Sequence, residues 1–367
     1  MARKSQENGG SSPSSALSAT RRKVTAQQIA EQAGVSRGTV DRVLHHRGGV
    51  HPDVQKRVEA IIAAHEYRPN RAGKALVMRR PLRLGVMLNA VGNPFFDEVR
   101  RGMQEARAAY SDFPVLLEWR EARGFDWAAQ CRELDELAAA ELDGLLITPL
   151  NHPAVVERLN ALADRDIPVV TVNTDVDGCR RLSYVGCHYV DSGRVAAQMV
   201  GLLTHGEGRV LVAMGSASMM GHTQRVQGFQ ERLAEAFARM QIVDTVETND
   251  DDRQAAVQVT RAMRAHPDTT ALYVSAGGVV GCVEAARQVA AGRPLQVVTC
   301  DLTEDIRRLL DEGQIQATIG QKPYRQGYES MKLLIEKLVF HQMPPPCLYM
   351  ENEIHVAYKN AVPVVSG

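Results

Sequence analysis

The sequence predicts a small all-α domain at the N-terminus, followed by a much larger α/β body made of two lobes. Three observations predict this class. Residues 25–44 hold two short helical patterns separated by a glycine, and residues 82–360 alternate strand-like with helix-like segments. The alternating region spans about 280 residues, which is too long for one small sheet. The 367 residues, 44% of them hydrophobic, suffice for two or three compact units.

The charges are unevenly divided along the chain, although the formal net charge is zero. Residues 1–80 carry 15 Lys and Arg against 6 Asp and Glu, and the remaining residues carry 28 against 37. A basic head on an acidic body is typical of a nucleic-acid-binding protein with a separate second domain. We expect a cytoplasmic protein without membrane contact, because no segment is long and apolar enough to span a membrane and the N-terminus lacks a signal peptide.

Residues 25–44, TAQQIAEQAGVSRGTVDRVL, have the pattern of a helix-turn-helix. Thr25 and Gln28 can form a capping box, Gly34 suits a left-handed helix end, and Ser36 can cap the second helix. The second helix would enter the DNA major groove, whereas a plain two-helix surface hairpin is the alternative. Besides Thr25 and Ser36 at the helix starts, the expected DNA-binding residues lie on the exposed face of the second helix: Arg37, Gly38, Thr39 and Arg42.

The segments around this motif complete the N-terminal domain. Residues 1–23 are rich in Ser, Gly and Arg and predict a disordered tail. Pro52 opens a third helix whose apolar stripe closes a three-helix core. Residues 68–76, RPNRAGKAL, predict a helix of about two turns, too short to be stable alone in water; a plain linker is the alternative.

The body predicts parallel sheets joined by right-handed crossovers, because apolar strand candidates alternate with amphipathic helical patterns. Ligands of such sheets bind at the carboxyl ends of the strands, which here means the cleft between the lobes. The strand candidates are residues 82–88, 115–119, 144–148, 167–172, 209–215, 242–248, 271–275, 295–300 and 315–320.

Signatures of catalysis and of metal binding fail on inspection. Gly206-Glu-Gly208 precedes its strand, whereas a dinucleotide-binding loop follows one. Gly215-Ser216 lacks the rest of a nucleophile elbow, because Met219 occupies the position of the second glycine. The six cysteines form no C-x-x-C pair and the histidines have no metal spacing. We expect no catalysis, no metal and no cofactor.

Two resemblances cover the chain from about residue 24. VTAQQIAEQAGVSRGTVDRVL followed by EYRPNRAGKAL resembles the DNA-binding domain of the lac repressor (LacI/GalR) family. The body resembles the type I periplasmic binding proteins of the ribose type, through NPFFDEVRRGM (93–103), IPVVTVNTD (167–175), VQGF (226–229), CDLT (300–303) and ATIGQKPYRQG (317–327). This second resemblance implies that the chain crosses between the lobes near 184–188, 321 and 350.

The first resemblance implies a hinge helix and linker at 69–80 that folds on DNA and pairs with its dimer mate in the minor groove. Leu76 matches the leucine that wedges into the central base step, flanked by Asn70, Arg71 and Ala72. It further implies a helix-turn-helix domain at 24–68 and an effector-binding and dimerisation body at 81–367.

The second resemblance implies the ligand residues. Sugars are held by aromatic faces and by polar groups on their hydroxyls. The candidates are Asn89, Asn93, Phe95, Phe96, Asn173, Thr223, Asp301 and Gln321. A core role stays open for one phenylalanine, as does a turn-capping role for Asp301. The chain departs from the ribose pattern at Asn173-Thr174, where Asp-Arg is usual, at Thr223, where arginine is usual, and at Ala276-Gly277, where Asn-Asp is usual. A sugar, a polyol or another ligand is therefore possible.

Together the resemblances imply a ligand-responsive transcription factor, most often a repressor, which binds a near-palindromic double-stranded operator as a homodimer. Its effector would be a small sugar-like or polyol molecule held between the lobes. The alternative is a sugar-binding transport receptor with the same fold, against which the helix-turn-helix and the missing signal peptide argue.

Overall fold

The computed structural model describes residues 24–44, 49–65, 80–89, 91–122 and 124–358. The chain divides into two compact units, Met1–Arg71 and Ala72–Gly367. The tail expected at 1–23 and the hinge helix expected from residue 69, with Asn70, Arg71, Ala72 and Leu76, lie outside the described residues.

The N-terminal unit holds the three predicted helices, α1 (Ala26–Ala33), α2 (Arg37–Leu44) and α3 (Pro52–Ala64). The capping box of Thr25 and Gln28 is formed, and Gly34 ends α1 with φ 64°, so both local predictions are confirmed. Pro52 occupies the first turn of α3, where its missing N–H costs nothing. The buried core comprises Ile29, Ala30, Ala33, Val40, Val43 and Val58.

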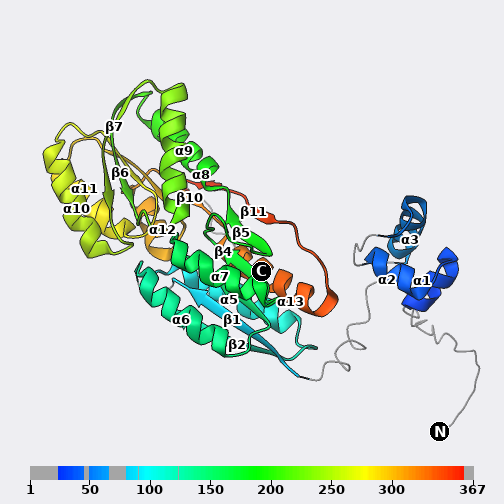
Figure 1. Cartoon of the computed structure of the whole chain (residues 1–367). Helices are drawn as coiled ribbons and strands as arrows, with labels where there is room; N and C mark the ends of the chain where they lie inside the picture. Colours follow the sequence, from blue (N-terminus) through cyan, green and yellow to red (C-terminus); the bar gives the residue numbers. More distant parts are fainter. Residues whose placement is uncertain (1–23, 45–48, 66–79, 90, 123, 359–367) are drawn as a thin grey trace, which may run out of the picture. The chain divides into compact units, whose positions relative to one another are not determined.

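The first lobe of the second unit is a six-stranded parallel sheet covered by helices on both faces (Figure 1). Its strand order is β11-β5-β4-β3-β1-β2. The strands are β1 (Leu82–Leu88), β2 (Val115–Glu121), β3 (Gly144–Ile147), β4 (Val169–Val172), β5 (Ser183–Cys187) and β11 (Cys347–Met350). Helices α5 (Phe95–Ala109) and α13 (Pro323–Phe340) share one core with the sheet, and α6 (Trp127–Ala139) and α7 (Pro153–Asp164) share another.

The second lobe repeats this plan with the order β12-β10-β9-β8-β6-β7. Only β12 runs antiparallel, against β10. The strands are β6 (Glu207–Met214), β7 (Arg239–Glu247), β8 (Ala271–Val274), β9 (Gln296–Cys300), β10 (Ala317–Gly320) and β12 (Glu353–His355). One face packs on α8 (Tyr189–Leu203) and α9 (Met220–Ala236), the other on α10 (Asp252–Ala265), α11 (Val279–Ala290) and α12 (Glu304–Asp311).

The chain passes between the lobes three times: after β5, after β10 and after β11. These passages agree with the crossings implied near 184–188, 321 and 350. All nine predicted strands are present within a few residues of their expected bounds, and β5, β11 and β12 are three strands that the pattern did not predict. Within the described part of the chain, no helix combines the length and the apolar character that a membrane span requires.

Candidate functional site

The predicted DNA-binding face is α2. Arg37, Gly38 and Arg42 are exposed on it, and Thr39 is half-buried. The Ser36 hydroxyl accepts a hydrogen bond from the Thr39 amide at 3.1 Å, and Thr25 Oγ1 accepts one from the Gln28 amide at 3.3 Å. The Thr25 hydroxyl therefore caps α1 and the Ser36 hydroxyl caps α2. Arg37 and Arg42 project from α2, which this cap and its buried apolar residues hold in place.

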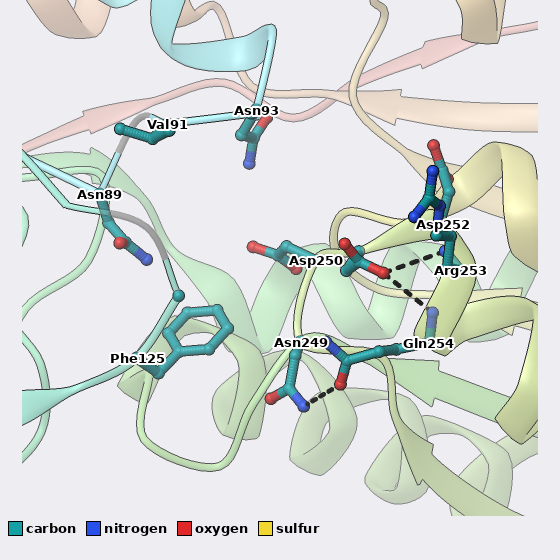
Figure 2. A pocket seen from close by; sticks show the side chains of 12 residues that line it. Asn89, Val91, Asn93, Phe125, Asn249, Asp250, Asp252, Arg253 and Gln254 are labelled. Atoms are coloured by element: carbon teal, nitrogen blue, oxygen red, sulfur yellow. Dashed lines mark hydrogen bonds between the residues drawn. The ribbon is translucent and has the colours of Figure 1, made fainter.

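A cavity of about 450 Å³ lies between the two lobes of the second unit. Figure 2 shows Asn89, Asn93 and Phe125 on the wall from the first lobe, facing Asn249 and Asp250 from the second. The full lining comprises Asn89, Val91, Gly92, Asn93, Gly124, Phe125 and the run from Asn249 to Gln254. Since these segments follow β1, β2 and β7, the cavity lies at the carboxyl ends of strands, as expected for parallel sheets.

Asp250 is the carboxylate that reaches furthest into this cavity in Figure 2. It follows β7 in a left-handed conformation, with φ 54°, and its Oδ1 accepts a hydrogen bond from the Gly277 amide at 2.9 Å. A Cβ atom at Gly215 would collide with this oxygen and with the His222 ring, so the bare glycine is what admits both groups. Burial raises the pKa of Asp250 to about 6.

His222 forms part of the support behind the cavity. Its Nδ1 accepts a hydrogen bond from the Ser216 amide at 3.0 Å. Its ring meets Phe125 edge to face, with centroids 5.9 Å apart. Burial, together with the charge of Arg225, lowers the pKa of His222 to about 3, so the imidazole stays neutral and keeps accepting at physiological pH.

Asn173, Asp301 and Gln321 are not among the residues that line this cavity and belong to a second cluster joined by hydrogen bonds. Asn173 Nδ2 donates to the Tyr189 hydroxyl at 3.0 Å, which donates to Gln321 Oε1 at 2.9 Å. Gln321 Nε2 in turn donates to Asp301 Oδ1. Asn173 and Asp301 both have positive φ, 68° and 73°, and each directly follows a strand. Such strained conformations are typical of functional sites.

Arg225 is the most informative residue of this cluster and was absent from the sequence-based candidates. Its side chain is buried, with 3% of the residue exposed. Nη1 donates to the Ser275 carbonyl at 2.8 Å, and the guanidinium lies 4.4 Å from the centre of the Tyr189 ring. Its Nε and Nη2 have no hydrogen-bond partner among the described residues. Buried N–H donors without acceptors are costly, which suits a group that awaits a ligand.

The other predicted residues take different places. Phe95 and Phe96 are each 4% exposed, pack in the core of the first lobe and are not among the residues that line the cavity. The core role left open for one of them thus applies to both. The Thr223 hydroxyl donates to the Met220 carbonyl at 2.9 Å inside α9. Asn93 Oδ1 accepts from the Phe95 amide at 3.1 Å, so it shapes the start of α5 as well as the cavity wall.

Sequence reasoning missed the whole cavity wall from Asn249 to Gln254, including Asp250, as well as Phe125 and Arg225. A signal existed for Arg225, because Gly221, Arg225 and Phe229 recur at helical spacing on the buried face of α9 and an arginine in a buried stripe is unusual. Among the residues that the structure describes, no group of His, Cys, Asp and Glu side chains is arranged to hold a metal ion.

Comparisons with known proteins agree with this architecture. Residues 18–70 match the family model for bacterial regulatory proteins of the lacI family, and residues 84–342 match the periplasmic binding protein domain. The chain is 26% identical to the HTH-type transcriptional regulator CelR of Thermobifida fusca, covering 92% of this chain and 98% of CelR. It is 27% identical to the ribose operon repressor of Bacillus subtilis, covering 85% and 90%.

A solved structure extends the comparison to the body alone. GanP, a glucose-galactose binding protein from Geobacillus stearothermophilus, is 25% identical and superposes with a TM-score of 0.71, covering 76% of this chain and 98% of GanP. The helix-turn-helix unit, which that match leaves out, separates this chain from a transport receptor of the same fold. The chain belongs to the lacI family of bacterial regulatory proteins and is a DNA-binding transcriptional regulator with a periplasmic-binding-protein domain as its body.

Proposed function

We propose that the chain is a repressor controlled by an uncharged polyhydroxy effector, a sugar or polyol, bound in the cleft between its lobes. The observation that carries this proposal is Arg225, a buried guanidinium with two unpartnered nitrogens. The carboxylates of Asp250 and Asp301 are close enough to Arg225 for its charge to lower the pKa of each against the effect of burial.

Hydroxyl groups satisfy such an arrangement better than other common ligand groups. A hydroxyl donates one hydrogen bond and accepts others, so it can donate to a carboxylate and accept from the guanidinium at once. Each carboxylate already has one protein donor on its Oδ1, from Gly277 and Gln321 respectively, which leaves Oδ2 for the effector. Phe125 offers an apolar face to C–H groups, and Asn89 and Asn93 offer amides.

The proposed effector site combines both groups of residues. We assign Phe95, Phe96 and Thr223 a supporting role, since the first two pack in the core of the first lobe and the third is bonded within α9. The residues proposed to touch the effector are Asn89, Asn93, Phe125, Asn173, Arg225, Asp250, Asp301 and Gln321.

On the DNA side, we propose a homodimer on a near-palindromic operator in the cytoplasm, with α2 of each copy in the major groove. Arg37, Gly38, Thr39 and Arg42 would read or contact the half-site, with Thr25 and Ser36 at the helix starts. In the hinge, Asn70, Arg71, Ala72 and Leu76 would enter the minor groove.

We propose domain boundaries at 24–68, 69–80 and 81–367. The curated relatives compared above are regulators by name, and we infer that this chain likewise acts by binding rather than by catalysis.

Effector and operator would be coupled through two states of the chain that differ in their affinity for each of them. A ligand shifts such an equilibrium only through its different affinities for the two states, and couplings of about 1–3 kcal/mol, or about 5- to 150-fold in affinity, are usual.

The test begins with selection of genomic fragments by the purified full-length chain, which should return one near-palindromic sequence. Gel shifts on that sequence are then repeated with a panel of neutral sugars and polyols, alongside their phosphates and acids. One neutral member should change operator affinity by about 5- to 150-fold. Arg225→Met should remove this response, while Gln227→Ala, an exposed change on the same helix, should keep it. A response only to phosphorylated or acidic members would refute the effector class.

A further inference from the structure

Residues 215–222, the loop after β6 together with the first turn of α9, carry one side chain of the second lobe, that of Met219, into the first. Met219 is 3% exposed and belongs to the hydrophobic core that covers the α6–α7 face of the first lobe. Every other member of that core comes from the first lobe, among them Leu134, Leu150 and Val155. A methionine anchored in the opposite lobe must leave its core whenever the lobes separate.

Two hydrogen bonds, each donated by a backbone amide, flank this methionine and also join the lobes. The Asn151 amide donates to the Ser218 carbonyl at 2.7 Å, and the Gly221 amide donates to Thr174 Oγ1 at 3.0 Å. The Gly221 amide belongs to the first turn of α9, whose own N-cap, Met219, supplies no side-chain acceptor. The first lobe thus satisfies a helix donor that the second lobe leaves without a partner.

The loop is braced by its own lobe, so it meets the first lobe as a preformed unit. The Ser216 amide donates to His222 Nδ1 at 3.0 Å, and the Ser218 amide donates to Ser216 Oγ at 3.2 Å. The Ala217 amide donates to Glu247 Oε2 at 3.3 Å. A rigid element loses little conformational entropy when it docks, so most of the energy of its contacts favours the closed lobes.

We propose that residues 215–222 form a latch that holds the two lobes closed without an effector. All the contacts named above join protein groups to protein groups, so none of them depends on a bound ligand. Burial of one methionine side chain alone favours the closed form by about tenfold to a hundredfold. The proposal rests on the proposed function only in taking the cleft beside the latch as the effector site.

Hydrogen–deuterium exchange of the full-length chain without any sugar tests the latch at single-residue resolution. The amides of Asn151 and Gly221 should exchange slowly, because both are donated across the lobes. Met219→Ala should accelerate exchange at both by about tenfold or more, since the buried anchor is lost. Met220→Ala, the neighbouring methionine that no hydrophobic core includes, should leave both rates unchanged.

A second variant distinguishes the loss of a contact between the lobes from a general loss of stability, which Met219→Ala could also cause. Thr174→Val removes the acceptor for Gly221 while keeping a similar shape, and should accelerate exchange at Gly221 with unchanged protection in the core strands β1 and β8. Exchange at Asn151 and Gly221 as fast as at exposed loop amides in the unaltered protein would overturn the latch, as would equal effects of Met219→Ala and Met220→Ala. Because no sugar is present, these outcomes do not depend on whether the effector class is right.

Discussion

Asp250, which we propose to contact the effector, also lowers the stability of the folded state. Burial raises its pKa to about 6, above the ordinary value of about 3.9, so the folded state holds a proton that the unfolded state has released between these pH values. Stability must therefore fall as pH rises from about 4 to about 6, and stay lowered above that. Asp250→Asn removes this loss and keeps an Oδ1 acceptor for Gly277.

We expect Asp250→Asn to be more stable than the parent above pH 6. The rise of the pKa to about 6 corresponds to at most about 3 kcal/mol. The gain should be smaller than this limit, because the residue is partly exposed. The gain should be smallest at pH 4, where the folded carboxyl is protonated and only about half of the unfolded carboxyls are ionised. Urea unfolding at pH 4, 6 and 8 measures this, with Asp268→Asn on the exposed surface as the control. A gain independent of pH would contradict the titration argument.

Asp301 provides a cleaner separation of ligand binding from DNA binding. Asn tolerates the left-handed conformation that Asp301 adopts and keeps an Oδ1 acceptor for the Gln321 amide, so Asp301→Asn should fold. It removes the charge, however, that makes Asp301 a strong acceptor for a hydroxyl. The effector response in a gel shift should therefore be lost, while operator binding without effector stays at the parent level. The control is Asp305→Asn, on the exposed side of α12. Loss of operator binding itself would make Asp301 structural.

At the scale of the element, α2 is a short helix held by a cap and a buried stripe, so single changes on its exposed face should leave the fold intact. Arg37 is exposed there, and an arginine that reads guanine in a bidentate manner is worth about 1–3 kcal/mol. Arg37→Ala should relax the preference at one position in each half-site, measured by binding to a set of single-base operator variants. Arg57→Ala removes the same charge from α3 and should not change base preference. Uniform weakening on all sequences would assign Arg37 to phosphate contact alone.

Across the whole molecule, the sequence predicts what depends on local patterns. Gly34 and the Thr25–Gln28 capping box predict the two ends of α1, and apolar runs predict nine strands. The strands β5, β11 and β12 were not predicted because they lie at the passages between lobes, where the apolar run is broken by Gly186 or exposed at Tyr349 and Ile354.

The candidate site likewise contains residues that a local pattern predicts and residues that it does not. Asn89 and Asn93 follow a strongly apolar strand, so their position at its carboxyl end could be predicted. Asp250 stands in the run Asn-Asp-Asp-Asp, which has the pattern of a solvated turn, and Arg225 stands in an amphipathic helix. Both acquire their role only because the second lobe brings α9 and the β7–α10 turn to one cleft, a tertiary arrangement that no local pattern encodes.

The latch implies a last prediction, for effector affinity. If only the closed form binds tightly, the apparent dissociation constant is the intrinsic one divided by the closed fraction. The latch keeps that fraction near one, so little of the effector's binding energy is used to close the lobes. Met219→Ala should lower the closed fraction and weaken the best-binding polyol of the panel, by about tenfold if about a tenth of molecules remain closed. Met219 is not among the residues that line the cavity, so the loss would not reflect a missing contact.

Isothermal titration with Met219→Ala, with Met220→Ala as the matched control, measures this effect. The weakening should come with a more negative heat-capacity change than in the parent, because closure on the effector then buries apolar surface that the latch otherwise keeps buried. Equal affinities for the parent and Met219→Ala would mean that the lobes close equally well without the methionine anchor. An unchanged heat capacity with weaker binding would instead point to a distorted site, since closure would then bury no additional surface.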